Sequence, residues 1–362
     1  MTIQINRDNL NKVVDRTDVL AETPYVADIT EALGLFQETY STQKLIEITR
    51  TTGGTHILGD KNWDERSQNI AGRERERMTL KIPHFPADDA IYPHDIDGVI
   101  STVTPWEAMN LASVAEVRAE KMVNLQNAHQ LTKTAARFQL LKEGTVYAPN
   151  GSMRTSYGDT VNYYTEFGVT RDSIALTLAG TADPRQQVRD LVAKVRLDAR
   201  HASGAVRGIV ALCGSDFFSA LIMNPFVTDA VKYVALPNNQ SLATLLGVNS
   251  DEPRFSAIDG QYPSITLWGI TWVDCGVAGY DSPTGSFVPF VDTDEAIVLP
   301  LGLTNLAKTY YAPANLFSAI NKRSQGAYWF ETASDRKIEI QTEQNFMNAL
   351  LYPACVKTLT LA

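Results

Sequence analysis

One long helical segment constrains this chain more than any other feature of its sequence. Thr104-Pro105-Trp106-Glu107 supplies an N-cap threonine, a proline at the first helical position and a glutamate at the third, which together form a capping box. From that motif to Gly144 no further glycine or proline occurs. Apolar residues recur along it mostly three or four positions apart: Val114, Val117, Leu125, Ala128, Leu131, Ala135, Phe138 and Leu141. The pattern predicts a helix over 105–143, roughly 55 to 60 Å long at about 1.5 Å per residue, which is unusual for a compact enzyme domain.

The chain before this helix is polar and weakly patterned. Residues 1–45 hold short apolar pieces interrupted by proline and glycine, which is typical of an arm that needs a partner surface. In 46–100, short β-like runs at 45–48 and 78–82 alternate with glycines and prolines, which predicts an extended hairpin with long connections. The centre of this segment, 52–72, has too few apolar residues for a core of its own.

Beyond the helix, strands and helices alternate. Asn150-Gly151 is a turn signal, and the apolar runs 161–169 and 174–178 predict a β-hairpin over 145–180. Asp183-Pro184 is expected to cap a second helix, 184–202. A mixed α/β domain over about 184–325 and a β-rich tail should follow, with strands at 206–213, 265–273, 287–291, 296–299, 337–342 and 356–361 and a helix from Ser215-Asp216 to Pro225.

Composition and charge exclude several classes of protein. With 362 residues, 44% hydrophobic and 20% charged, the chain can bury a sizeable core. No stretch approaches the roughly 18 to 20 consecutive apolar residues of a membrane span. Asn6-Arg7-Asp8 stands where a signal peptide needs apolar residues, so we expect a protein made in the cytoplasm and not bound to a membrane. A net charge of −9 argues against a protein that mainly neutralises phosphates, although it permits one that encloses nucleic acid.

Catalytic signatures are missing from the sequence. It contains no GxGxxG, GxxxxGK[ST], HExxH or GxSxG motif. Cys213-Gly214-Ser215-Asp216 follows a predicted strand and opens a predicted helix, but its glycine spacing is wrong for a nucleophile elbow. Ser215 or Asp216 acting as a helix cap explains the motif without chemistry. We therefore expect neither enzymatic activity nor a cofactor.

Metal ligands and reactive thiols are equally weakly indicated. Three histidines lie within the predicted extended hairpin, His56, His84 and His94, with Asp88, Asp89 and Asp95 nearby. Their spacing matches no common metal site, so none is expected. The three cysteines lie far apart, each in an apolar run: Cys213, Cys275 and Cys355. We expect all three thiols to be buried and chemically quiet.

A run of alternating charge is the strongest candidate for a functional surface. It reads Arg73, Glu74, Arg75, Glu76 and Arg77. In a strand, successive side chains point to opposite faces, so the arginines would line one face and the glutamates the other. Two interpretations remain open: a solvated strand edge protected by charge, and a contact surface for another protein subunit.

Several segments together resemble a known family. They are Tyr164-Thr165-Glu166-Phe167-Gly168-Val169, Ala211-Leu212-Cys213-Gly214-Ser215-Asp216-Phe217-Phe218, Gly269-Ile270-Thr271-Trp272, Glu295-Ala296, Pro300-Leu301-Gly302, Tyr310-Tyr311-Ala312-Pro313-Ala314 and Asn321. In this order and spacing they resemble the major capsid proteins related to phage lambda's protein E, from about Leu33 to Leu361. Near the end, Gln341-Thr342-Glu343-Gln344-Asn345-Phe346 departs from the Gln-Ser-x-Pro-Leu run that members often have.

The resemblance implies an α+β chain with the tailed-phage (Hong Kong type, lambda-like) major capsid fold, also found in the floor of herpesvirus shells. Its parts would be an N-terminal arm 1–45, an extended β-hairpin loop 46–100, a peripheral domain 101–183 with spine helix 105–143 and hairpin 145–180, an axial domain 184–325, and a C-terminal return to the peripheral domain 326–362.

The same resemblance implies a structural function. Copies of the chain would form hexamers and pentamers of an icosahedral virion shell that encloses double-stranded DNA without binding it specifically. Scaffolding, portal and decoration proteins would be further partners. A tail or decoration protein, or an unfamiliar α/β enzyme, remains the alternative.

Overall fold

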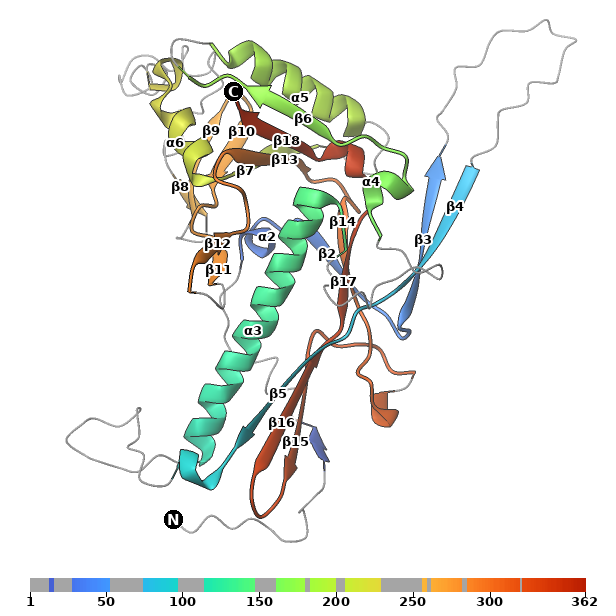
Figure 1. Cartoon of the computed structure of the whole chain (residues 1–362). Coiled ribbons are helices and arrows are strands. Elements are labelled where there is room, and N and C mark those ends of the chain that lie inside the picture. Colours follow the sequence, from blue (N-terminus) through green and yellow to red (C-terminus); the bar gives the residue numbers. More distant parts are fainter. Residues whose placement is uncertain are drawn as a thin grey trace, which may run out of the picture.

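The computed structural model describes residues 13–15, 28–52, 74–96, 114–146, 161–179, 183–199, 206–228, 256–258, 262–281, 285–319 and 321–362. These residues form separate sheets around one long helix, with two further long helices packed on the largest sheet (Figure 1). The expected α+β class is confirmed.

The long helix is α3 (Val114–Glu143), which runs beside most of the sheets (Figure 1). It ends where the sequence predicts, because Gly144 adopts a positive φ of 72° and its N–H donates to Leu140 O at 2.8 Å. The predicted beginning at Thr104 lies outside the described residues. The predicted apolar stripe is partly wrong: Leu131 is 43% exposed, whereas Arg137 is buried.

A four-stranded antiparallel sheet packs against the N-terminal half of α3. Its order is β1 (Val13–Asp15), β15 (Tyr328–Ala333), β16 (Ile338–Gln344) and β5 (Phe85–Ile91). Ile91, Met122, Trp329 and Ile340 form the small core between sheet and helix. β5 therefore pairs with the tail of the chain, although 46–100 was expected to be a single extended loop.

A three-stranded sheet packs against the C-terminal half of α3, in the order β17 (Phe346–Leu350), β14 (Ala307–Tyr311), β2 (Phe36–Tyr40). β2 follows the short helix α2 (Ile29–Ala32) and pairs with β14 in parallel. The expectation that residues 1–45 form an arm that needs a partner surface is wrong for this stretch, because the side chains of Ile29, Leu35 and Phe36 are buried in the main core of the same chain.

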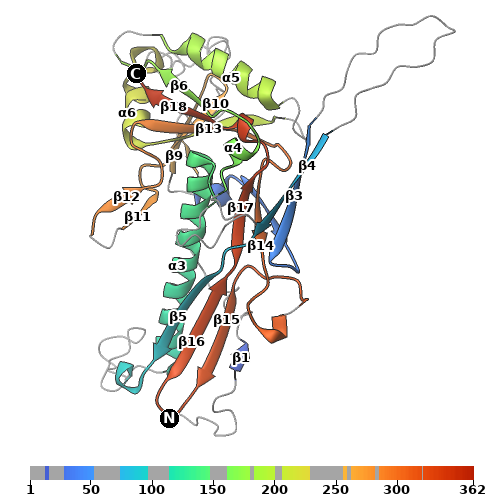
Figure 2. The ribbon, with the colours of Figure 1, turned by 45° about the vertical axis from the view of Figure 1, so that its right-hand side comes forward.

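β3 (Leu45–Thr52) and β4 (Glu74–Lys81) form a separate two-stranded antiparallel sheet. In both views this hairpin extends away from α3 and the other sheets (Figures 1 and 2). The hairpin predicted from the runs at 45–48 and 78–82 is therefore confirmed at the level of its strands.

The largest layer is a seven-stranded mixed sheet at the other end of α3 from β1 (Figure 2). In spatial order its strands are β6 (Asp172–Leu176), β18 (Lys357–Leu361), β13 (Glu295–Leu301), β7 (Gly208–Cys213), β10 (Ile270–Asp274), β9 (Tyr262–Leu267) and β8 (Ser256–Ile258). Helices α5 (Arg185–Ala199) and α6 (Ser215–Met223) pack on it through one apolar cluster. The predicted run 265–273 is two strands, because Trp268 and Gly269 turn the chain with positive φ.

The hairpin predicted over 145–180 is wrong. The described part contains the short helix α4 (Tyr163–Glu166), begun by Asn162, whose Oδ1 accepts hydrogen bonds from Tyr164 N and Thr165 N. β6 then pairs in parallel with β18 from the end of the chain. This last strand lies in the seven-stranded sheet, whereas the tail was expected to return wholly to the layers beside α3.

Shorter elements complete the described residues. They are β11 (Gly279–Asp281) paired with β12 (Phe287–Pro289), and the single 3-10 turns η2 (Pro93–Asp95), η4 (Phe317–Ala319) and η5 (Pro353–Cys355).

Candidate intersubunit surface

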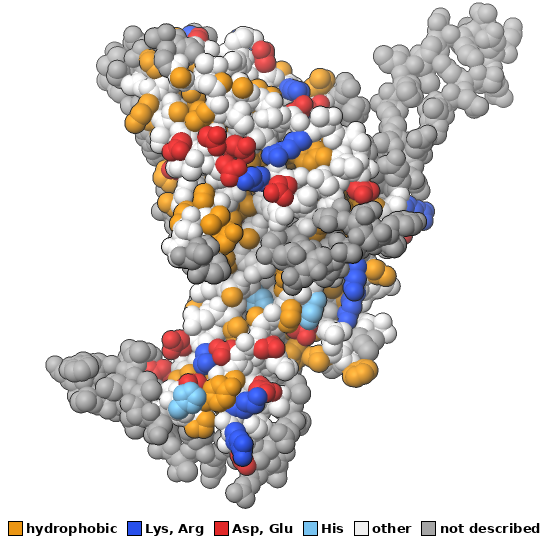
Figure 3. All heavy atoms as spheres, viewed as in Figure 1, with side chains coloured by type: hydrophobic (Ala, Val, Ile, Leu, Met, Phe, Trp, Pro, Cys, Tyr) orange, Lys and Arg blue, Asp and Glu red, His pale blue; other side chains and the backbone are white. Residues whose placement is uncertain are grey.

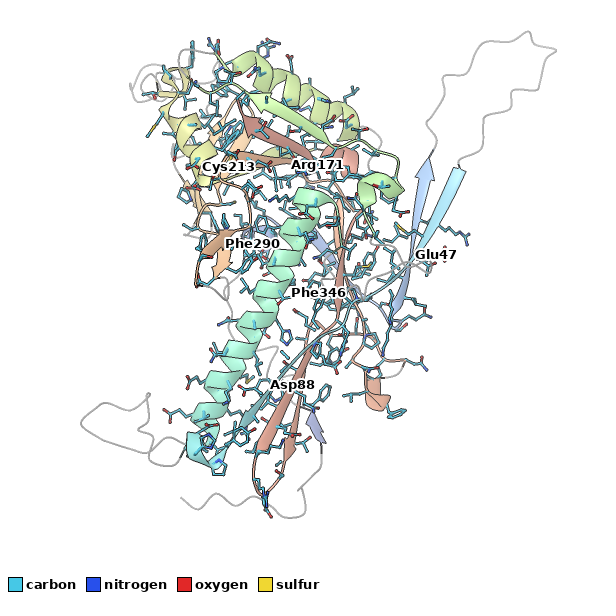
Figure 4. The ribbon with its side chains drawn as sticks, viewed as in Figure 1. Glu47, Asp88, Arg171, Cys213, Phe290 and Phe346 are labelled. Carbon is cyan, nitrogen blue, oxygen red and sulfur yellow. The ribbon has the colours of Figure 1, made fainter. Side chains whose placement is uncertain are left out.

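The β3–β4 hairpin has one apolar and one polar face. Ile46 and Ile48 lie opposite Leu80 and Met78 in the register, and Ile46, Ile48 and Leu80 are buried in the main core. On the other face Glu47 and Arg77 form an ion pair, Nε to Oε1, of 3.3 Å (Figure 4 labels Glu47). Their side chains are 51% and 67% exposed, so the pair stabilises the subunit by less than about 1 kcal/mol.

The predicted charged run lies on β4 as far as it is described. Glu74, Arg75 and Glu76 are strand residues whose backbones lie opposite positions 52, 51 and 50. Arg73 lies outside the described residues, and of the five side chains only that of Arg77 is described. The strand is therefore confirmed, and its contact with another subunit stays a prediction.

A buried cluster of charged side chains fixes the segment that leads into this hairpin. Arg137 of α3 is 1% exposed, and its Nη1 lies 3.2 Å from Glu31 Oε1 and 3.9 Å from Asp28 Oδ2. Its Nη2 lies 3.6 Å from Glu38 Oε1, and the guanidinium stacks 5.0 Å from the centre of the Phe36 ring. The cluster thereby joins α2 and β2 to α3 and orients the chain before β3.

Glu31 is ionised within this cluster. Burial alone would raise the pKa of its carboxyl, but Lys133, whose Nζ lies 2.6 Å away, and Arg137 lower it below the ordinary value. Lys133 and Arg137 of α3 thus both face the carboxylate of Glu31, and these ion pairs stabilise the contact between α2 and α3.

A second buried ammonium joins three elements of the large sheet. Lys357 of β18 is 1% exposed and contacts Asp172 of β6 and Asp198 of α5, the latter at 2.5 Å. Burial would raise the pKa of Asp172, but Lys357 and Lys194 lower it. Beside them Arg171 Nη2 donates to Thr358 Oγ1 at 2.6 Å (Figure 4 labels Arg171). These contacts fix the parallel β6–β18 edge.

The strand-to-helix step at 213–216 is structural. The N-cap of α6 is Gly214, without a side-chain cap, so the expectation that Ser215 or Asp216 caps this helix is wrong. Thr293 O accepts the hydrogen bond from Phe217 N at 2.8 Å instead. A Cβ at Gly214 would lie 2.0 Å from Asp292 O, which explains glycine at this position.

The three thiols are buried, as the sequence predicts. Burial raises the pKa of Cys213 and Cys275, and it raises that of Cys355 to about 11. Thiolates are the reactive form of cysteine, so these residues serve packing.

Among the described residues, the histidines and aspartates considered as metal ligands do not gather into one site. His84 Nδ1 lies 2.7 Å from Asn345 Oδ1, His94 Nε2 lies 3.3 Å from Asp95, and Asp89 pairs with Lys121 at 3.0 Å. His56 is outside the described residues. The residues that the structure describes contain no group of three or more side chains suited to a metal ion. Among the same residues, no helix has the length and apolarity needed to cross a bilayer.

Comparison with known proteins gives the family. The family model described as phage major capsid protein E matches residues 12–361. The major capsid protein of Pseudomonas phage KPP10 is 29% identical over 345 residues, 94% of each chain, and that of Salmonella phage Felix O1 is 26% identical over 365 residues, 95% of this chain and 93% of the other. The capsid structure of Cyanophage P-SCSP1u overlaps 93% of this chain and 88% of its own with 13% identity and a TM-score of 0.46.

The family match spans nearly the whole chain and includes every segment that carried the resemblance. That resemblance is confirmed, and the tail, decoration and enzyme alternatives are set aside, since the family consists of structural proteins of the virion shell. The chain belongs to the family of phage major capsid protein E.

Proposed function

We propose that copies of this chain assemble into hexamers and pentamers that close into an icosahedral head shell around double-stranded DNA. The family match over residues 12–361 is the observation that supports this most strongly. Electron microscopy of particles formed by the purified protein tests it, since tubes or trimers would contradict the closed shell.

In this proposal each layer of the fold has a place in the capsomer. The β3–β4 hairpin is the extended loop, α3 with the three- and four-stranded sheets is the peripheral domain, and the seven-stranded sheet with α5 and α6 is the axial domain. Two apolar clusters support this division, because the seven-stranded sheet packs against α5 and α6 in one and the four-stranded sheet packs against α3 in another. The main core joins the parts, since it contains residues of the β3–β4 hairpin, the three-stranded sheet, α3 and the seven-stranded sheet. The arm would comprise only the residues before α2.

The charged run on β4 is the proposed contact between subunits. Arg73, Arg75 and Arg77 alternate with Glu74 and Glu76, and a chain with a net charge of −9 offers many carboxylates to a basic strand. Among the described side chains of this face, Arg77 and Glu47 form an ion pair that is too exposed to account for five charges in a row. The arginines of this run would form charge-assisted hydrogen bonds with acidic groups of the adjacent subunit.

Arg75→Glu tests this contact. We expect the subunit to stay soluble with an unchanged melting temperature, because exposed charges usually change stability by less than about 0.5 kcal/mol. Particle yield should fall sharply and in a salt-dependent way, because like charges across an interface cost several kcal/mol at every copy. Arg75→Lys keeps the charge and should assemble. A strongly lowered melting temperature, or assembly equal to the parent's, would reject the contact.

Scaffolding, portal and decoration proteins are proposed as further partners on the family resemblance alone. DNA is proposed as enclosed cargo. Because the chain is acidic, shells should retain little free DNA at physiological salt in a mobility-shift assay, and tight binding there would contradict this.

A further inference from the structure

Between Lys121 and Lys142, the exposed residues of α3 carry no charge. The basic residues of the helix are instead paired with other elements of the protein: Arg118 with Glu331, Lys121 with Asp89, Lys133 with Glu31, Arg137 with Glu31 and Lys142 with Asp292. The exposed residues between Lys121 and Lys142 are Val123, Asn124, Asn127, Ala128 and Leu131. A helix that faces water normally shows the reverse arrangement, with charges outward.

The β11–β12 hairpin and the residues just before it add exposed apolar side chains, beside the exposed Asp281 of β11. These apolar side chains are Val277 at 68%, Tyr280 at 39% and Phe287 at 51%. Two ring contacts join the hairpin to α3: Tyr280 to Phe290, with centroids 6.0 Å apart, and Phe290 to Phe138 at 5.0 Å. Leu131 precedes Phe138 by seven residues and so lies on the same side of the helix.

Figure 4 places Phe290 beside the C-terminal half of α3, and Figure 3 shows hydrophobic side chains gathered over the neighbouring hairpin. We call the exposed residues of both elements, Val123, Leu131, Val277, Tyr280 and Phe287, the α3 surface.

The most exposed large apolar side chain is on the other side of the subunit. Phe317 is 96% exposed on η4, and both ribbon views place η4 across the sheets from α3 and the β11–β12 hairpin (Figures 1 and 2). The loop around it is anchored, since Asn315 N donates to Glu343 Oε2 at 3.0 Å and Ser324 Oγ donates to Tyr311 O at 2.9 Å. The fold thus exposes the phenyl ring of Phe317 on a loop whose two sides are anchored by hydrogen bonds.

We propose that Phe317 of one copy of this chain docks on the α3 surface of a second copy. Rings of subunits need two different, complementary patches on opposite sides of each subunit, and these two features meet that requirement. An aromatic anchor seated on apolar surface is the usual centre of a protein interface. Few charges would lose water on contact, because the basic residues of α3 already pair with other elements of their own chain. The inference rests on the proposed assembly and goes beyond it by naming a contact separate from the β4 strand.

Paired cysteines test the contact directly. The native thiols are buried, so Phe317→Cys and Phe287→Cys in one chain add the accessible pair. In shells of this double variant, a short bis-maleimide should join chain to chain and give a ladder of linked subunits on a denaturing gel. A control chain with Phe317→Cys and Leu197→Cys should give no ladder, because Leu197 is 56% exposed on α5, outside the α3 surface.

A charge substitution supplies the energetic test. Phe317→Asp should leave the melting temperature unchanged, because the ring is 96% exposed, and should raise the subunit concentration needed for assembly at least about tenfold. Phe317→Tyr should assemble like the parent. Shells of the double cysteine variant that give no ladder, or a ladder equal to the Leu197 control, would overturn the docking while leaving the proposed shell intact. A parent protein that forms no shells would overturn both.

Discussion

Replacing Arg137 with methionine should destabilise the folded subunit strongly. Methionine is similar in length but lacks the guanidinium, which lies within 4 Å of the carboxylates of Asp28, Glu31 and Glu38. The side chains of these three acidic residues are 7%, 18% and 37% exposed. Removing one partner of a buried ion pair costs about 3–5 kcal/mol, because the other charge stays buried without compensation. Lys133 still faces Glu31, and Glu38 is partly in water, so we expect the lower end, about 3 kcal/mol.

A matched control separates burial from charge. Arg185 pairs with Asp183 at 2.7 Å, but their side chains are 45% and 40% exposed, so Arg185→Met should cost less than about 1 kcal/mol. Urea unfolding of the unassembled subunits, followed by tryptophan fluorescence, gives both free energies of unfolding. If Arg137→Met costs no more than Arg185→Met, the buried cluster does not hold α2 and β2 to α3.

Three further predictions concern the subunit itself. Burial lowers the pKa of His129 from 6.5 to about 4, so between these values the unfolded chain binds a proton that the folded chain does not. The contribution of His129 to the free energy of unfolding should therefore be constant above pH 6.5 and fall by about 3 kcal/mol towards pH 4. His129→Gln should flatten this slope in unfolding measurements across the same pH range. Gly214→Ala should reduce the free energy of unfolding by at least about 1–3 kcal/mol and lower the melting temperature, because its Cβ would lie 2.0 Å from Asp292 O. Gly326→Ala is the control, since nothing lies within 4 Å of a Cβ there, and equal melting temperatures of the two variants would contradict this prediction. The native thiols should react with maleimide only on unfolding, and rapid labelling of native shells would show that they are accessible.

Local pattern was enough to predict several elements. Short β-like runs at 45–48 and 78–82, separated by a stretch with several glycines, predicted that β3 and β4 pair. The end of α3 at Gly144 followed from the same kind of local rule. The part of the alternating charged run that the structure describes, 74–77, lies in a strand as expected.

The parallel strand pairings could not be predicted from the sequence. β2 pairs with β14 and β6 with β18 across most of the chain, and a parallel pair leaves no short turn signal between its strands. For this reason β6 was placed in a local hairpin, and residues 36–40 were placed in an arm. α4 was missed because Asn162, its cap, stands inside an apolar run that also fits a strand.

The face of α3 was predicted wrongly for an electrostatic reason. Periodicity assigns apolar residues to the inside, but Lys133 and Arg137, four residues apart on one face, are buried because Asp28 and Glu31 lie against them. Basic residues spaced by four were visible in the sequence, and their acidic partners about 100 positions earlier could be identified only in the folded chain.

Electron microscopy of the purified full-length protein tests the central claim most directly. The chain should form closed particles of uniform size with five- and six-fold capsomers, at high concentration and with a scaffolding protein supplied. A homogeneous monomer under all of these conditions, across low and high salt, would contradict the account.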